Sequence, residues 1–166
     1  MKLPRIHAVP RRVVVTGMGA VAPNGIGINA YGAALRNGTS GIGAISLFDA
    51  DGMECRVAAE VKDFAAEDFL SLQEMRRVGR AVPLLIAATA EALERARICW
   101  QRLTIEEKQA WGVIVGSGGG TTDFMEDQYR LYFTDRLRKV SAYNISSSTP
   151  GSLSREISLP YGFRGP

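Results

Sequence analysis

Hydrophobic residues in this chain form two continuous runs, each leading into a glycine-rich segment. Val13, Val14 and Val15 lie at the centre of the first run, which spans 12–17, and the second run spans 111–116. Apolar runs without polar alternation are typical of strands covered on both faces. The pattern therefore predicts two buried strands, each followed by a turn in which glycines free the backbone.

Shorter elements are expected between and after these strands. The remaining pattern predicts a strand at 56–61 and helices at 29–37, at 63–73 and from Asp123 onward. Polar residues and glycines predict loops at 38–55, 104–109 and 141–154, the last with a short helix, and a turn at 159–166.

The stretch 78–98 is apolar on most of a helical surface. A helix of this kind is buried in the interior of a structure. Pro83 predicts a kink or the true start of the helix, because its ring presses against the carbonyl four residues earlier. A chain of 166 residues has difficulty covering such a helix, which suggests that part of the structure lies outside this sequence.

The helix from Asp123 onward carries three signals. Asp123 and Glu126 have the spacing of a capping box, with Asp in place of Ser or Thr. Cations suit the C-terminal end of a helix dipole, so the basic cluster at 136–139 predicts the last turn. One apolar stripe runs along this helix and consists of Met125, Tyr129, Tyr132, Phe133 and Leu137.

The glycines after the first strand allow two interpretations. Gly17-x-Gly19-x-x-Ala22 fits a loose dinucleotide-binding fingerprint, whereas a structural turn needs only the same small residues. A nucleotide loop leads directly into a helix, with an acidic residue about 20 positions later. Here the segment 23–25 (Pro-Asn-Gly) interrupts the chain, and the segment 38–41 is a glycine-rich loop. These features weaken the nucleotide interpretation.

Composition excludes several classes of function. The net charge is +3, and no dense basic run with interleaved aromatics indicates nucleic-acid binding. No stretch approaches the roughly 20 apolar residues of a membrane span. Residues 1–10, which contain the only histidine, His7, are expected to be an unstructured leader without a secretory signal. Two distant cysteines favour a reduced, cytoplasmic protein, and nothing in the sequence suggests a metal or a cofactor.

Several separated segments, in this order, resemble one family, the type II β-ketoacyl-acyl-carrier-protein synthases of fatty-acid and polyketide synthesis. The segments are Arg12–Gly19 with Pro23 and Gly25, Gly38–Ile42, Phe48-Asp49, Val61–Phe64, Val115–Gly120 and Tyr161–Pro166. The resemblance implies an α/β thiolase-like fold in α-β-α-β-α layers, of which residues 11–166 supply the N-terminal half. It also implies a decarboxylative Claisen condensation of an acyl thioester with malonyl-carrier protein, without a cofactor.

The resemblance places the catalytic residues beyond Pro166. The family's nucleophilic cysteine, two histidines and a lysine have no counterpart here, so this chain alone is expected to be inactive. Cys55 and Cys99 lack a histidine partner and a helix N-terminus, which lower the pKa of a reactive thiol. Both are expected to be packing residues.

Three further site assignments follow from the resemblance. Gly118 and Gly119 would border the acyl pocket, and Gly119 stands where the family often has a larger aliphatic residue, which suggests a wider pocket. The alternative is a loop that simply requires glycine. Tyr143, Asn144 and Ile145 would lie at the dimer interface and close the partner's pocket.

The third assignment concerns the carrier protein. Arg76 and Arg77 would dock this acidic partner, and the alternative is a solvated basic turn. The expected assembly is a homodimer or a heterodimer with a ketosynthase-like chain. Other hypotheses are a non-catalytic relative resembling a chain-length factor, a nucleotide-binding protein, and a carrier-protein interaction module. The isolated chain is expected to aggregate, since its buried elements would lack their cover.

Overall fold

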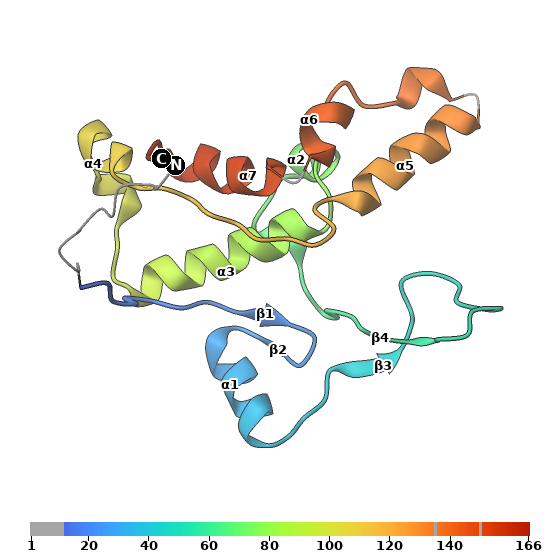
Figure 1. The fold of residues 1–166 in the computed structure, drawn as a ribbon, viewed down its shortest axis with the longest axis horizontal. Coiled ribbons are helices and arrows are strands. Elements are labelled where there is room, and N and C mark those ends of the chain that lie inside the picture. Colours follow the sequence, from blue (N-terminus) through green and yellow to red (C-terminus); the bar gives the residue numbers. More distant parts are fainter. Residues whose placement is uncertain (1–11, 135, 150) are drawn as a thin grey trace, which may run out of the picture.

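The computed structural model describes residues 12–134, 136–149 and 151–166, so the expected leader at 1–10 lies outside the described residues. Short strands and helices alternate in the first part of the chain, and helices follow (Figure 1). The elements are β1 (Val21–Ala22), β2 (Gly25–Ile26), α1 (Ile28–Arg36), β3 (Ile42–Ala44), β4 (Val57–Ala59), η1 (Ala66–Asp68), α2 (Leu72–Met75), α3 (Ala81–Arg95), η2 (Trp100–Arg102), α4 (Ile105–Gln109), α5 (Thr122–Phe133), η3 (Leu137–Lys139), α6 (Asn144–Ser148) and α7 (Ser152–Tyr161).

Helix α3 is the centre of the structure, as its apolar surface predicts. No residue from Ala81 to Leu93 is exposed. Pro83 lies in the first turn, where a missing N–H costs nothing, so it marks the start of the helix rather than a kink. Helix α7 packs along α3, and the N-terminal segment passes along it as well (Figure 1).

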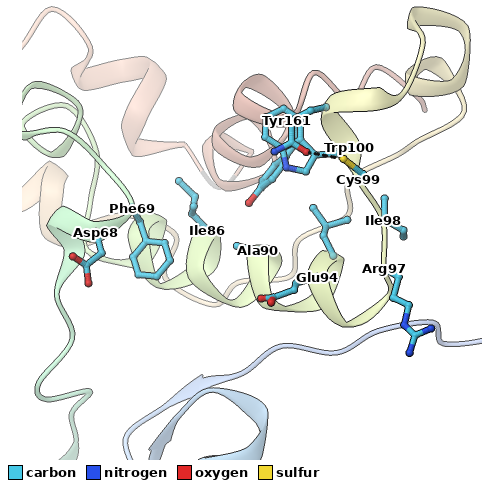
Figure 2. A pocket seen from close by; sticks show the side chains of 12 residues that line it. Asp68, Phe69, Ile86, Ala90, Glu94, Arg97, Ile98, Cys99, Trp100 and Tyr161 are labelled. Atoms are coloured by element: carbon cyan, nitrogen blue, oxygen red, sulfur yellow. Dashed lines mark hydrogen bonds between the residues drawn. The ribbon is translucent and has the colours of Figure 1, made fainter.

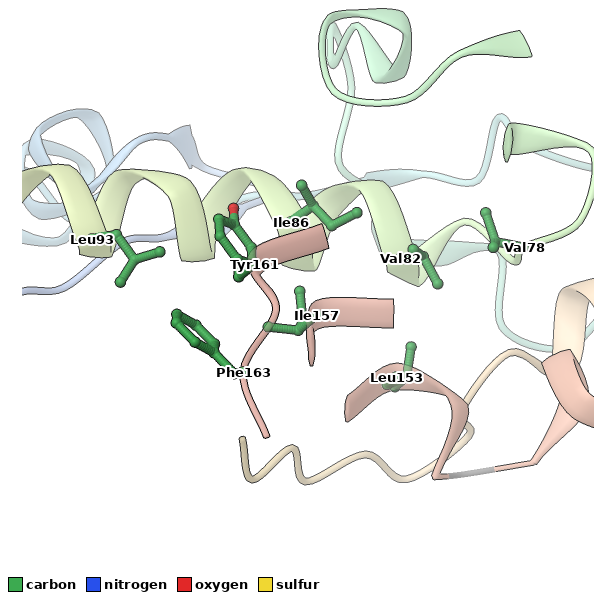
Figure 3. Close-up of a cluster of buried hydrophobic side chains, with 8 residues drawn as sticks. All are labelled: Val78, Val82, Ile86, Leu93, Leu153, Ile157, Tyr161 and Phe163. Atoms are coloured by element: carbon green, nitrogen blue, oxygen red, sulfur yellow. The ribbon is translucent and has the colours of Figure 1, made fainter. Parts of the chain in front are cut away.

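The hydrophobic core lies between α3 and the C-terminal part of the chain. Side chains spaced about one helical turn apart on both partners face one another (Figure 3). Ring stacking extends this core, with the centroids of Tyr161 and Phe163 5.5 Å apart and those of Trp111 and Phe163 5.0 Å apart. The core residues are Val78, Val82, Ile86, Leu93, Leu153, Ile157, Tyr161 and Phe163.

Two antiparallel strand pairs lie on the other side of α3. Strands β1 and β2 form a hairpin around Pro23 and Asn24, and β3 pairs with β4. The second pair confirms the predicted strand near 56–61, although the predicted loop at 38–55 contains its partner β3. Glu60 follows β4 and accepts hydrogen bonds from the backbone N–H groups of Ser46 and Leu47, both at 3.0 Å.

The predicted strands at 12–17 and 111–116 do not form in the described residues. Both segments carry no strand hydrogen bonding, and Val13 and Ile114 are 91% and 97% exposed. A strand requires the backbone groups of a neighbouring strand, and no described strand pairs with either segment. The second segment instead receives one backbone hydrogen bond, from the N–H of Gly165 to the carbonyl of Trp111 at 2.7 Å.

Several helix boundaries also differ from the prediction. Helix α5 begins at Thr122, so Asp123 lies inside its first turn and is not the predicted capping-box residue. It ends at Phe133, before the basic cluster, which lies in and around the separate turn η3. The predicted loop at 104–109 is mostly helix α4, stabilised by a capping box between Thr104 and Glu107.

Candidate functional site

Three predicted site regions converge at one corner of the structure. These are the basic segment 74–80, the glycine-rich loop 117–120 and the residues that begin α6. The guanidinium of Arg77 lies 5.9 Å from the ring centre of Tyr143, and the N–H of Arg80 donates to Oδ2 of Asp123 at 2.6 Å. The structure therefore brings together residues that the sequence placed in separate roles.

The basic segment is held by α2. The hydroxyl of Ser71 and the carboxylate of Glu74 form a capping box, in which Ser71 Oγ donates to Glu74 Oε2 at 2.7 Å. This hydroxyl and the backbone N–H of Ser71 hold the pKa of Glu74 below its ordinary value. Glu74 also forms an ion pair with Arg77 at 3.8 Å.

The two candidate docking arginines are not equivalent. Arg77 is half-buried between Glu74 and Tyr143. Arg76 is exposed, and no acidic side chain within the described ranges forms an ion pair with it. Arg76 is therefore available to an external acidic partner, whereas Arg77 is partly occupied by its neighbours.

The glycine-rich loop has space for larger side chains. A Cβ built on Gly118 would meet no atom within 4 Å, and one built on Gly119 would meet only Thr122 Oγ1, at 3.5 Å. Only Gly120 in this loop adopts a positive φ, 59°. Among the described residues, neither a positive φ nor a close contact at the Cβ position restricts Gly118 or Gly119 to glycine.

The predicted interface residues at α6 face different surroundings. Ile145 is 83% exposed and Tyr143 is 52% exposed, whereas Asn144 is half-buried and its backbone carbonyl accepts a hydrogen bond from Ser148 Oγ at 2.5 Å. Two outward apolar side chains are compatible with a protein contact here, and Asn144 serves the internal geometry of α6.

A cavity of about 550 Å³ lies elsewhere, beside the C-terminal half of α3 (Figure 2). Cys99 lines it, and its thiol lies 3.6 Å from Oε1 of Gln101. Both Cys99 and Cys55 are exposed, so the expectation that they are packing residues was wrong. No histidine is among the described residues to activate either thiol.

The parts of the chain that the structure covers contain neither a metal-binding cluster nor a membrane-spanning helix. These residues contain no cluster of three or more His, Cys, Asp or Glu side chains that could hold a metal ion. None of the described helices has the length and apolar character needed to span a membrane.

Sequence reasoning missed three carboxylates that fix this architecture. Glu91 accepts hydrogen bonds from backbone N–H groups near α1, Glu60 from those at 46–47, and Asp123 from Arg80. Their partners lie 13 to 71 positions away in the chain, so no local spacing reveals them.

The family of the chain is established by comparison with known proteins. The family model described as "Beta-ketoacyl synthase, N-terminal domain" matches residues 10–166. The chain therefore belongs to the β-ketoacyl synthase family and corresponds to its N-terminal domain. This result confirms the resemblance and the thiolase-like fold class.

Individual relatives agree with this assignment. The 3-oxoacyl-[acyl-carrier-protein] synthase 2 of Synechocystis sp. is 33% identical over 94% of this chain and 37% of its own length. The enzyme of the same name from Vibrio harveyi is 35% identical with the same coverage. The solved ishigamide ketosynthase/chain length factor superposes with a TM-score of 0.75 at 27% identity, covering 95% of this chain and 38% of the other. The chain thus spans well under half the length of these relatives.

Proposed function

We propose that this chain is the N-terminal half of a condensing enzyme that elongates acyl groups carried on acyl carrier protein. The observation that carries the proposal is the convergence of the basic segment 74–80, the glycine-rich loop and α6 at one corner, in a chain that matches the family's N-terminal domain. The reaction begins when a thiolate attacks the acyl thioester and the carrier thiol leaves. Malonyl-carrier protein then loses CO₂, and its enolate attacks the enzyme-bound acyl group, so that the new C–C bond replaces the thioester bond and the enzyme thiolate leaves.

Residues 12–166 supply binding and shape in this proposal, and the nucleophile lies outside them. Neither Cys55 nor Cys99 has the surroundings of an activated thiol, because no cationic side chain pairs with either of them in the described structure. The chain alone should therefore form no acyl-enzyme. The enolate and oxyanion would be stabilised by imidazoles and backbone N–H groups of the other half.

Arg76 is the main docking residue for the carrier protein in this proposal, and Arg77 contributes less. An exposed guanidinium without an internal partner can meet an acidic surface without first breaking an ion pair. Arg76→Glu should weaken binding of holo-acyl carrier protein more than Arg77→Glu, with a steep dependence on salt. Arg102→Glu, an exposed arginine on η2 at the other end of α3, is the matched control. Equal affinities for all three variants would contradict the docking assignment.

Gly119 widens the acyl pocket in this proposal. The open space around its Cβ position permits a larger side chain without disturbing the loop. Gly119→Ile in the complete enzyme should slow acylation by long or branched acyl groups and leave short ones unaffected. An unchanged preference for acyl length would show that Gly119 does not set the pocket.

The exposed side chains Tyr143 and Ile145 support a dimer contact with a second copy or a ketosynthase-like partner. The second candidate is that this chain is itself a non-catalytic partner resembling a chain length factor, because one structural relative is a ketosynthase/chain length factor. Acylation of the native assembly distinguishes the two, since a non-catalytic chain would acquire no acyl group.

A further inference from the structure

Gly79 and Asp123 fit one another at the start of two helices. Gly79 is buried just before α3, and a Cβ built on it would lie 2.6 Å from Oδ1 of Asp123 and 2.8 Å from Cβ of Thr121. Real Cβ atoms do not approach other atoms so closely. The absence of a side chain at position 79 therefore makes room for the carboxylate of Asp123.

The carboxylate uses this space to bind the basic segment. Oδ2 of Asp123 accepts the backbone N–H of Arg80 at 2.6 Å, although 43 positions separate the two residues. Arg80 is the N-cap of α3, and its own side chain provides no cap. A carboxylate is favourable near a helix N-terminus because the N–H groups there carry partial positive charge. One side chain of α5 thus anchors the C-terminal end of the basic segment.

The first turn of α5 also holds the glycine-rich loop in place through hydrogen bonds. Thr122 Oγ1 donates to the carbonyl of Gly119, and the fully buried Thr121 donates through its hydroxyl to the carbonyl of Ser147 in α6. The N–H of Gly120 donates to Ser117 Oγ at 2.8 Å. Beyond these bonds, Gly116 and Gly118 have open space around them. The position of the loop therefore depends on the turn that contains Asp123.

We propose that Asp123 is a positioning residue that couples residues 76–80 of the basic segment to the glycine-rich loop 117–120. A carrier protein bound at Arg76 and Arg77 then stabilises the loop that borders the acyl pocket, through the bond between Asp123 and the N–H of Arg80. The acyl pocket is therefore ordered when a loaded carrier protein is bound. This coupling rests on the docking and pocket roles proposed above.

Amide hydrogen exchange of residues 117–122, with and without holo-acyl carrier protein, tests the coupling. Carrier protein should slow exchange in wild-type protein. In Asp123→Ala the affinity for carrier protein should stay within about threefold, whereas the loop should exchange roughly tenfold faster and gain no protection, because one charge-assisted hydrogen bond is lost. Asp123→Asn keeps an oxygen acceptor and should restore most of the protection.

Asp127→Ala is the matched control. Asp127 lies one turn later on α5, is exposed, and pairs only with Arg130 among the described residues. It should behave as the wild type. The coupling would be wrong if carrier protein protected the loop of Asp123→Ala as well as it protects the wild-type loop. It would also be wrong if carrier protein bound the wild type without changing exchange in the loop. Neither result would affect the docking role. Failure of the wild-type protein to bind carrier protein would overturn the docking role and the coupling with it.

Discussion

The carboxylate of Glu91 caps the first turn of α1 from a position 63 residues further along the chain. Its Oε1 accepts the backbone N–H of Ile28 at 2.8 Å, and its Oε2 accepts that of Ala20 at 3.0 Å. The N-cap of α1, Gly27, has no side chain to perform this task. A residue in the middle of the central helix thus fixes both the hairpin β1–β2 and the helix that follows it.

Glu91→Ala should loosen α1 selectively. Two partly buried N–H groups would lose a charged acceptor, which costs about 2 kcal/mol. Exchange of the α1 amides should accelerate, while the amides of α3 remain protected. Glu94→Ala, an exposed neighbour on the same helix, should leave both helices unchanged. Equal exchange in the two variants would show that the Glu91 bond does not hold α1.

Gly17 and Gly19 allow the N-terminal segment to approach α3. A Cβ on Gly17 would collide with the carbonyl oxygen of Ala92, and one on Gly19 with that of Ala88. Backbone atoms of a helix cannot move aside, so Gly17→Ala or Gly19→Ala should destabilise the protein by about 1–3 kcal/mol. Urea denaturation measures the loss. Gly116→Ala, where a Cβ meets nothing within 4 Å, should cost far less, and a similar loss would contradict the packing argument.

Acid should weaken the attachment of the loop at 46–47 through Glu60. The hydroxyl of Ser46, followed by the N–H groups of Ser46 and Leu47, holds the pKa of Glu60 below its ordinary value. A lowered folded-state pKa contributes stability above the ordinary carboxyl pKa of about 4.3, and this contribution disappears as pH falls through the folded-state value.

The stability difference between wild type and Glu60→Gln should therefore be largest near neutral pH and shrink below about pH 4. Urea denaturation at a series of pH values measures it. Glu54→Gln, an exposed carboxylate without a described hydrogen bond, provides the baseline. A difference that stays constant down to pH 3 would refute this role of Glu60.

The exposed apolar segments 12–17 and 111–116 should drive association of the isolated chain. Val13, Val15 and Ile114 are 91%, 79% and 97% exposed. Replacing all three by threonine retains strand propensity but removes apolar surface, and should raise the concentration of half-association at least about tenfold. Sedimentation velocity measures this change. Ile105→Thr on α4, which is 60% exposed, should have little effect if the two segments are responsible.

Local pattern predicted α1, α3 and α5 better than the two long strands, whereas the predicted helix at 63–73 is only the 3₁₀ turn η1 and the beginning of the short helix α2. The apolar surface of 78–98 predicted α3, because helical hydrogen bonds are internal to the segment, and Pro83 allowed either a kink or the helix start that the structure shows. The strands at 12–17 and 111–116 were predicted from β-branched runs, but strand formation depends on a neighbour that local sequence does not supply. The capping role of Asp123 was assigned to the wrong helix, since it depends on contact with Arg80.

Prediction of the candidate site was limited in the same way, because local sequence does not show contacts between distant residues. Motifs placed Arg76, Gly119 and Tyr143 in three functional regions, and only the folded chain shows that these regions meet. The unequal environments of Arg76 and Arg77 could not be predicted, because the partners of Arg77 include Tyr143, which lies 66 positions later in the chain.

Acylation of the native protein tests the central proposal most directly. The protein would be incubated with carrier protein loaded with an acyl thioester, and its intact mass and the modified peptide would be determined. We predict one acyl group on a polypeptide that contains residues 12–166, attached to a cysteine other than Cys55 and Cys99. No adduct, or an adduct on either of these two cysteines, would contradict it.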